Sequence, residues 1–291
     1  MTATEHHTTI TVTACTNAVG AEIAGIDVAA GVTDGQMDVL RRALADHGVI
    51  FLRDQRLTPD QHEAFAERWG TINVNRFFTP VPGHPRVAEV RKEPDQAVNI
   101  GGGWHTDHSY DEIPAMGSLL YARELPAVGG DTLFAGMNAA YEALSDGLKA
   151  TLRGLRAEHS SRHIFGKAAE AGKGGYGEST RGRIGNAEAA EQDAVHPVVI
   201  AHPQSGRPCL YVNGAFTLRF VGWTDAESKP LLDHLYQHAG RPEFTYRFRW
   251  EEGSMAIWDN RAVQHYALND YQGQRRLMHR ITIEGEALAA A

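Results

Sequence analysis

The sequence predicts a β-rich α+β fold in a single domain. Runs of alternating or β-branched residues, which are typical of strands, recur along the chain, for example at residues 9–13, 208–212 and 275–283. Helical patterns are fewer and lie between these runs. The 291 residues contain no evident repeat, low-complexity tract or linker, and chains of this length commonly form one barrel or sandwich. We therefore expect residues 1–291 to form one domain, with strands around a core and helices outside.

Capping boxes mark three of the predicted helices. In a capping box, a threonine and a Glu or Gln three residues later satisfy each other's backbone N–H groups. Such boxes begin at Thr33, Thr58 and Thr224. Apolar residues at helical spacing follow, and the helices are predicted to end near Gly48, Gly70 and Gly240. A further amphipathic helix is predicted over residues 138–154.

The composition is that of a soluble globular protein, with 42% hydrophobic and 22% charged residues. The net charge of −8 argues against nucleic-acid binding, because neutralising phosphates requires a basic surface. No apolar run is long enough to span a membrane, and the polar N-terminus does not resemble a signal peptide. The two cysteines, Cys15 and Cys209, make neither a disulfide framework nor a Cys-based zinc site. We therefore expect a cytoplasmic protein that binds a small molecule and neither nucleic acid nor a membrane.

A candidate metal site consists of His105 and Asp107, with His265 as a distant partner. If the first two lie on a strand, they point to the same face, and the fold could bring the second histidine to them. Two imidazoles and one carboxylate on one side of a metal are the ligand set of non-haem Fe(II) oxygenases, which leaves coordination positions open. The alternative is an ordinary surface or hydrogen-bonded His-Asp pair, because the chain contains 15 histidines.

The last predicted strand carries Arg276 and Arg280 on one face and apolar residues on the other. The apolar face requires a hydrophobic layer, so the arginine face is expected to look into the core. Buried guanidinium groups are costly unless anions pair with them. Either carboxylates of the protein or those of a small molecule could provide this pairing, since arginine binds carboxylates in a bidentate manner.

Residues 160–195 differ from the rest of the chain, because they are rich in Gly, Ala, Glu and Lys and poor in large apolar residues. A segment of this length within a compact domain is usually a functional lid or a disordered insert. A passive surface loop is the alternative. We expect a lid or insert at these positions.

Four motifs together carry a resemblance to a known family. They are His105-x-Asp107, Gly129-Gly130-Asp131-Thr132, Trp258-Asp259-Asn260-Arg261 followed by His265, and residues 274–280. Their order and spacing resemble those of the taurine/2,4-D (TauD/TfdA) family of Fe(II)- and 2-oxoglutarate-dependent dioxygenases. The resemblance extends from Gly20 to Gly285, and it implies a double-stranded β-helix (jelly-roll) core with flanking α-helices.

The resemblance also implies roles for individual residues. The residues that match the family's iron ligands are His105, Asp107 and His265. Thr132 and Arg276 match residues that hold the distal carboxylate of 2-oxoglutarate, and Arg280 matches an arginine that contacts the acidic group of the substrate. The implied cofactors are Fe(II), 2-oxoglutarate as cosubstrate and O2. The implied reaction hydroxylates a substrate carbon, with release of succinate and CO2, and can thereby cleave the substrate.

The substrate positions depart from those of taurine-specific family members. Where those members have a histidine, a tyrosine and an asparagine that bind taurine, this chain has Asn75, Phe78 and Gly101. The loss of polar partners argues against taurine, because a site that depends on hydrogen bonds discriminates strongly when they are absent. Phe77 and Phe78 instead predict a more apolar pocket around the substrate.

The predicted substrate is a small to medium organic acid with an apolar or aromatic body, its anionic end held by Arg280. Residues 159–166 and 224–232 look more like the aryloxyalkanoate-cleaving branch of the family. An alkyl sulfate or sulfonate, or a substrate of secondary metabolism, is the alternative. Because family members often form dimers or tetramers, we expect a homo-oligomer.

Two function classes outside the family are also considered. A zinc hydrolase could use the same three metal ligands, but it would not need Thr132 and Arg276 to hold a dicarboxylate. A non-catalytic jelly-roll binding protein would usually have lost a metal ligand, and this chain retains all three. Dependence on 2-oxoglutarate therefore separates these classes.

Overall fold

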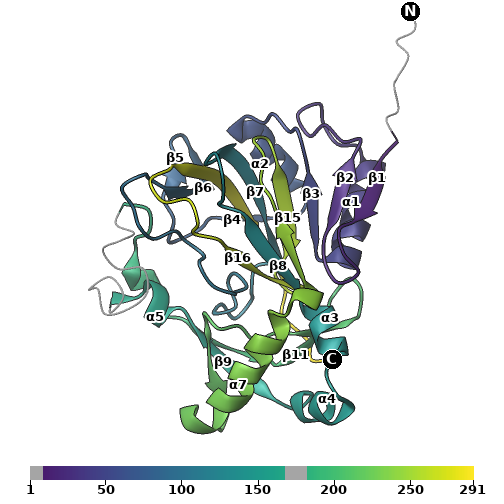
Figure 1. Cartoon of the computed structure of the whole chain (residues 1–291), viewed down its shortest axis with the longest axis vertical. Helices are drawn as coiled ribbons and strands as arrows, with labels where there is room; N and C mark the ends of the chain where they lie inside the picture. The colour runs from purple at the N-terminus through teal and green to yellow at the C-terminus, as the bar shows by residue number, and fades with distance from the viewer. Residues whose placement is uncertain (1–8, 168–181) are drawn as a thin grey trace, which may run out of the picture.

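The computed structural model describes residues 9–167 and 182–291, and its largest element is a β-sheet (Figure 1). The strands of this sheet are β1 (Thr11–Ala14), β2 (Ala21–Ala24), β3 (Val49–Leu52), β4 (Ile72–Asn73), β5 (Pro80–Val81), β6 (His84–Lys92), β7 (Gly117–Glu124), β15 (Met255–Asp259) and β17 (Arg276–Ile283). Their order is β1-β2-β3-β15-β7-β17-β6-β5, and β4 pairs with β17 beside this path. The sheet is antiparallel apart from the parallel pair β2 and β3.

A second, antiparallel sheet packs on one face of the first. It consists of β8 (Thr132–Gly136), β14 (Thr245–Phe248) and β16 (Val263–Ala267), in the order β14-β8-β16. Phe51 of the large sheet stacks on Phe248, with 4.0 Å between ring centroids, and contacts Phe134 edge-on at 5.5 Å. The two packed sheets form the jelly-roll core that the sequence led us to expect.

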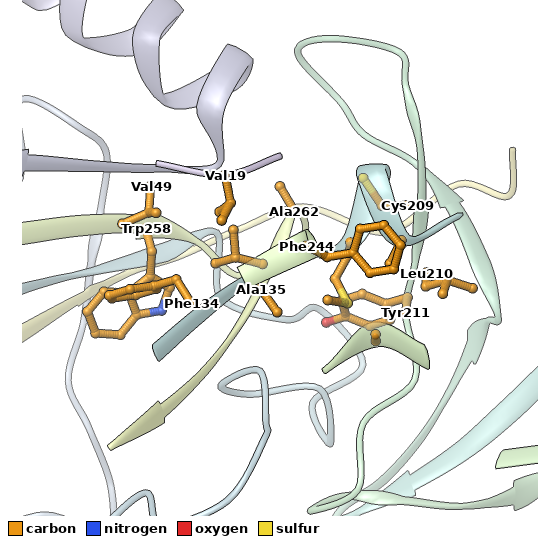
Figure 2. Close-up of a cluster of buried hydrophobic side chains, with 14 of the residues drawn as sticks. Val19, Val49, Phe134, Ala135, Cys209, Leu210, Tyr211, Phe244, Trp258 and Ala262 are labelled. Atoms are coloured by element: carbon orange, nitrogen blue, oxygen red, sulfur yellow. The ribbon is translucent and has the colours of Figure 1, made fainter. Parts of the chain in front are cut away.

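Apolar side chains fill the space between the two main sheets (Figure 2). Val49, Phe134 and Trp258 come from β3, β8 and β15, and none is more than 2% exposed. Full burial of such a side chain stabilises the fold by about 1.5–3 kcal/mol. This packing fixes the second sheet relative to the large sheet, and β16 of the second sheet carries His265.

Two smaller sheets lie below the main sheets in Figure 1. One contains β9 (Arg156–Ser160), β10 (Asp193–Pro197) and β13 (Thr217–Phe220), in the order β10-β9-β13. The other pairs β11 (Val199–Ala201) with β12 (Pro208–Leu210).

Helices cover the outer face of the large sheet and the lower part of the molecule (Figure 1). They are α1 (Asp34–His47), α2 (Pro59–Glu67), α3 (Met137–Glu142), α4 (Asp146–Leu152), α5 (Arg162–Phe165) and α7 (Asp225–Ala239), with 3-10 turns η2 (Ala187–Ala189) and η3 (Pro242–Phe244). Met37 and Leu40 of α1 and Phe65 of α2 share a buried cluster with Ile281 and Ile283. The apolar face of the last strand is thus covered by helices, as predicted. None of the helices in the described part of the chain has the length and apolar character to cross a bilayer.

Three of the predicted helices begin where the sequence indicated, and the fourth predicted helix is in fact two helices. The capping boxes at Thr33, Thr58 and Thr224 each contain both reciprocal hydrogen bonds. The single helix predicted over residues 138–154 is wrong, because α3 and α4 are separate. Ser145 accepts a hydrogen bond from the backbone N–H of Leu148, and a serine in this position begins a new helix.

The predicted lid or insert is described only at its two ends. Residues 168–181 lie outside the described residues. α5 precedes this segment, and η2 and the first residues of β10 follow it.

Candidate active site

The three residues predicted as metal ligands lie together beside β16 and β17. Nε2 of His105 is 3.9 Å from one carboxylate oxygen of Asp107, and Nε2 of His265 is 3.8 Å from the other. All three residues are buried, and their donor atoms lie within 4.8 Å of one another. No other such group of His, Cys, Asp or Glu occurs among the residues that the structure describes.

His105 and Asp107 lie on a loop, so the prediction that they share a strand face is wrong. The backbone N–H groups of His105 and His265 donate to each other's carbonyl oxygens, at 3.1 and 2.8 Å. The hydroxyl of Thr106 donates to a backbone carbonyl in the turn before β16, at 2.6 Å. His108 then adopts a left-handed conformation with φ of 60°. The loop is held to β16 through His105 and to the turn before β16 through Thr106, and these contacts position the metal motif without a strand.

The protonation states of these residues suit a divalent metal ion. Nδ1 of His105 lies 2.8 Å from the carbonyl oxygen of Gly103, and a carbonyl can only accept, so Nε2 is left with a free lone pair. Burial and the neighbouring imidazole lower the pKa of His265 to about 3, so this side chain is neutral. Burial alone would raise the pKa of Asp107, but Arg280 and the histidines hold it below its ordinary value. Two imidazoles and a carboxylate match the donor set of a non-haem iron site.

Thr132 and Arg276 come together at one end of the site. Arg276 is 5% exposed, and its Nε and Nη2 have no hydrogen-bond partner within the described residues. Its guanidinium lies 5.8 Å from the ring of Trp250, whose Nε1 donates to the hydroxyl of Thr132 at 3.0 Å. Burial of an unpaired guanidinium costs several kcal/mol. This end of the site therefore fits the carboxylate of a ligand.

Arg280 differs from Arg276, although both lie on the same face of β17. Nη1 of Arg280 is 3.3 and 3.4 Å from the two carboxylate oxygens of Asp107. Its guanidinium stacks on Phe78, 4.5 Å from the ring centroid, and its Nε has no partner among the described residues. Of the two pairings considered for the arginines, the structure shows the one with a protein carboxylate. Arg280 has a protein carboxylate, whereas Arg276 forms no ion pair with any described residue.

A cavity of about 530 Å³ connects the metal ligands with both arginines. Its walls are mainly apolar, and the large apolar side chains that line it are Phe78, Val90, Val98, Ile100, Trp104, Tyr110, Leu120, Ile164, Phe165, Phe216, Tyr236 and Trp258. Such a concave site, with few polar groups at fixed positions, is typical of small-molecule binding.

The residues predicted to contact substrate are placed in two different ways. Phe78 and Gly101 line the cavity, whereas Asn75 and Phe77 are not among its lining residues. The side-chain oxygen of Asn75 accepts hydrogen bonds from the backbone N–H groups of Phe77 and Phe78, at 2.9 and 3.0 Å. Phe77 stacks on Phe165, with 4.4 Å between ring centroids. Asn75 and Phe77 thus support neighbours that line the cavity.

Several cavity residues were missed by sequence reasoning. Tyr110 follows the metal motif by three residues, and this closeness could have identified it. Asn99 and Phe216 also line the cavity. Phe216 lies in a turn far along the chain from the metal motif, and no sequence pattern identified it. Trp250, whose indole N–H donates to Thr132, was not identified either.

A second buried cluster holds the chain before His265. Asp259 accepts hydrogen bonds from His202 Nε2 at 3.0 Å and from Arg261 Nη2 at 2.7 Å and Nε at 2.9 Å. Arg261 also donates to Gln204 at 2.8 Å and to Glu286 at 3.2 Å. We call this cluster the Asp259 network. It is closed, because each charged group in it has protein partners, and it anchors the turn from which β16 starts.

Similarities to known proteins extend over the whole fold. The family model described as "Taurine catabolism dioxygenase TauD, TfdA family" matches residues 11–282. An alpha-ketoglutarate-dependent sulfate ester dioxygenase from Pseudomonas putida is 35% identical over 92% of this chain and 87% of its own length. An alpha-ketoglutarate-dependent 2,4-dichlorophenoxyacetate dioxygenase from Cupriavidus pinatubonensis is 33% identical over 92% of this chain and 95% of its own.

A solved structure supports the same assignment. The crystal structure of a taurine dioxygenase from Burkholderia xenovorans has a TM-score of 0.80 and 34% sequence identity to this chain, and it covers 97% of this chain and 93% of its own. With the matched family model and the buried His-Asp-His group, these similarities show that the chain belongs to the TauD/TfdA family of dioxygenases.

Proposed function

We propose that this enzyme hydroxylates, and can thereby cleave, a small to medium organic acid with an apolar or aromatic body. The reaction class follows from the family: the enzyme is a dioxygenase that uses Fe(II), 2-oxoglutarate and O2. The observation that carries the substrate proposal is an apolar cavity that contains the metal-ligand group and has a buried guanidinium beside it.

In this proposal His105, Asp107 and His265 hold the iron, and Thr132 and Arg276 hold the distal carboxylate of 2-oxoglutarate. When bound, the iron and 2-oxoglutarate supply the oxidising chemistry, with O2 consumed and succinate and CO2 released. Arg276 has unpaired donors for a carboxylate. Thr132 accepts from Trp250, so its own hydroxyl proton is available to the same carboxylate. Both side chains are buried, and charge interactions are stronger in such a setting than in water.

Arg280 is the proposed anchor for the acidic group of the substrate. Its contact with Asp107 and its stacking on Phe78 fix the guanidinium next to the metal ligands. An anion bound there would have its apolar body against the aromatic wall formed by Phe165 and Phe216. A carbon close to the anionic end would then lie nearest to the iron, where hydroxylation leads to cleavage if that carbon bears an oxygen.

A second candidate substrate class is the alkyl sulfates and sulfonates. Sulfate esters share the chemistry of an anionic group on an apolar body, and a sulfate ester dioxygenase is among the relatives. Aryloxyalkanoates are favoured by the aromatic wall, because aryl rings pack well against Phe and Tyr side chains. The same cavity would also accommodate an acidic intermediate of secondary metabolism.

The proposal includes the organisation of the protein. We propose one domain over residues 1–291, and a homo-oligomer, dimer or tetramer, in the cytoplasm. The matched family model supports one domain, since it extends over residues 11–282. The net charge of −8 and the concave apolar cavity support a small-molecule partner and argue against nucleic acid.

Succinate release tests the proposal. The protein, loaded anaerobically with Fe(II) and 2-oxoglutarate, is exposed to O2 with a panel of aryloxyalkanoates, alkyl sulfates, sulfonates including taurine, and amino acids. We expect succinate to rise with aryloxyalkanoates or alkyl sulfates and the signal to vanish in Asp107→Ala. Stimulation by taurine or amino acids alone would contradict the substrate proposal. A zinc hydrolase would show no dependence on 2-oxoglutarate, and a binding protein would show no turnover.

A further inference from the structure

Tyr110 lines the cavity, and none of the hydrogen bonds among the described residues involves its hydroxyl group. The side chain is 3% exposed, and it shares the cavity lining with Asp107 and Arg280. Nearly all buried polar groups in proteins have a partner, and a buried phenol usually finds one for its O–H group. The hydroxyl oxygen of Tyr110 is not completely enclosed by protein atoms, so a ligand in the cavity can offer it an acceptor.

The ring of Tyr110 is held in one position from several sides. It packs edge-on against Phe216, with 4.8 Å between ring centroids, and against Phe77 at 6.2 Å. The guanidinium of Arg76 lies 5.4 Å from the ring centroid. Arg76 is itself fixed by a salt bridge to Asp111 at 2.6 Å. A group held so tightly loses little entropy when it binds a ligand, which favours binding.

The phenol of Tyr110 is a hydrogen-bond donor. Burial and the neighbouring Asp111 raise its pKa well above the ordinary value for tyrosine, so the hydroxyl keeps its proton at any physiological pH. The charges of Asp107 and Arg280 are also close enough to affect this pKa, in opposite directions. The hydroxyl is thus a neutral donor in the neighbourhood of the proposed anion anchor.

We infer that Tyr110 is a substrate-binding residue whose hydroxyl donates a hydrogen bond to the acidic group held by Arg280. This inference rests on the proposed function. Arg280 uses Nη1 for Asp107, while its Nε is unpaired within the described residues. A guanidinium that already contacts a protein carboxylate cannot donate hydrogen bonds to every oxygen of an anion that has two or three of them. A neutral donor completes the binding of the anion and adds no second charge that would need compensation.

The test compares Tyr110→Phe with a matched control, Tyr211→Phe. Both changes remove only a hydroxyl. Tyr211 is also buried, and its hydroxyl has no partner among the described residues, but it does not line the cavity. Calorimetry under anaerobic conditions measures the Kd of phenoxyacetate and of hexyl sulfate for protein loaded with Fe(II) and 2-oxoglutarate. Thermal unfolding and the Kd of 2-oxoglutarate are measured for each variant.

We expect Tyr110→Phe to raise the Kd of the anion that the wild type binds by about 10- to 100-fold, as for other hydrogen bonds to charged groups. Tyr211→Phe should leave that Kd within about twofold, and neither change should alter binding of 2-oxoglutarate. An unchanged Kd in Tyr110→Phe, or equal weakening in both variants, would overturn the role of Tyr110 and leave the proposed function intact. If the wild type itself bound neither anion and formed no succinate with the wider panel, the proposed function would fail, and this inference with it.

Discussion

Two buried clusters in this molecule contain an aspartate, an arginine and histidine, but they differ in how completely their polar groups are paired. In the Asp259 network the aspartate contacts nitrogens of His202 and Arg261 at 2.7–3.0 Å. In the metal-site cluster the corresponding separations, between Asp107 and its arginine and histidines, are 3.3–3.9 Å. Nδ1 of His265 and Nε of Arg280 also have no partner within the described residues.

The difference separates a structural cluster from a functional one. Hydrogen bonds at the short distances of the Asp259 network are complete, so that cluster has no place for a ligand. The wider separations at Asp107 leave room for an ion between the donor atoms, and the adjacent Arg276 lacks an ionic partner among the described residues. Sequence composition alone would not distinguish the two clusters, whereas the pattern of unpaired groups does.

The largest expected effect is the loss of metal binding in Asp107→Ala. Removing a ligand that carries the negative charge should weaken Fe(II) binding by more than about 100-fold and abolish succinate formation, because even partners of metal ligands contribute 10- to 100-fold. Equilibrium dialysis with Fe(II) under anaerobic conditions measures this. The control is Asp193→Ala, since Asp193 is half exposed and does not line the cavity. Normal iron binding by Asp107→Ala would show that the cluster is not the metal site.

A substitution in the Asp259 network should change the stability of the protein and not its chemistry. Arg261→Met removes the main partner of a buried carboxylate and should lower the free energy of unfolding by about 3–5 kcal/mol. Urea denaturation of the apo-protein measures the change. Arg162→Met is the control, because its ion pair with Asp193 is solvent-exposed and should contribute no more than about 1 kcal/mol. Equal losses in both variants would remove the distinction between closed and open clusters.

In contrast to Arg261→Met, Arg276→Met should not lower the free energy of unfolding. Its guanidinium is buried without an ion-pair partner among the described residues, so its replacement by an apolar side chain should leave the free energy of unfolding unchanged or raise it by about 1–3 kcal/mol. Affinity for 2-oxoglutarate should fall on the order of 100-fold, since a buried charge pair with the ligand is lost. Denaturation and calorimetry on the same sample test both parts. A loss of stability as large as that of Arg261→Met would contradict the comparison.

The smallest expected effect is that of Thr132→Val. It removes one hydroxyl from the 2-oxoglutarate end and should weaken binding of that cosubstrate about tenfold. The indole N–H of Trp250 loses its acceptor, so the free energy of unfolding should also fall, by about 1–3 kcal/mol. Thr132→Ser keeps the hydroxyl and serves as the control in calorimetry and denaturation. If the serine variant bound 2-oxoglutarate as weakly as the valine variant, the hydroxyl would have no role in binding.

Features within one segment could be predicted from the sequence, because their physical causes are local. The capping boxes depend on residues three apart, and the two faces of β17 follow from alternation. Both were confirmed by the structure. The split between α3 and α4 was missed because Ser145 was read as one more position in an amphipathic pattern.

Relations between distant segments were harder to predict. The grouping of the metal-site residues came mainly from resemblance to a family, and their loop conformation was not foreseen. The different pairing of Arg276 and Arg280 depends on where Asp107 lies in three dimensions. The inclusion of Tyr110 and Phe216 in one cavity depends on how the turn before β13 packs over the metal loop. Neither relation is encoded by spacing along the chain.

The mutual backbone hydrogen bonds of His105 and His265 have a consequence for how the protein matures. One partner lies in the first half of the chain and the other near its end, so a growing chain cannot bring the metal-site residues together until most of it has been synthesised. Closing a loop of this length is entropically costly and tends to occur late in folding. The iron can then be captured only by a chain that is already nearly folded. Once bound, it would stabilise that state by mass action, so that iron supply and folding yield become coupled.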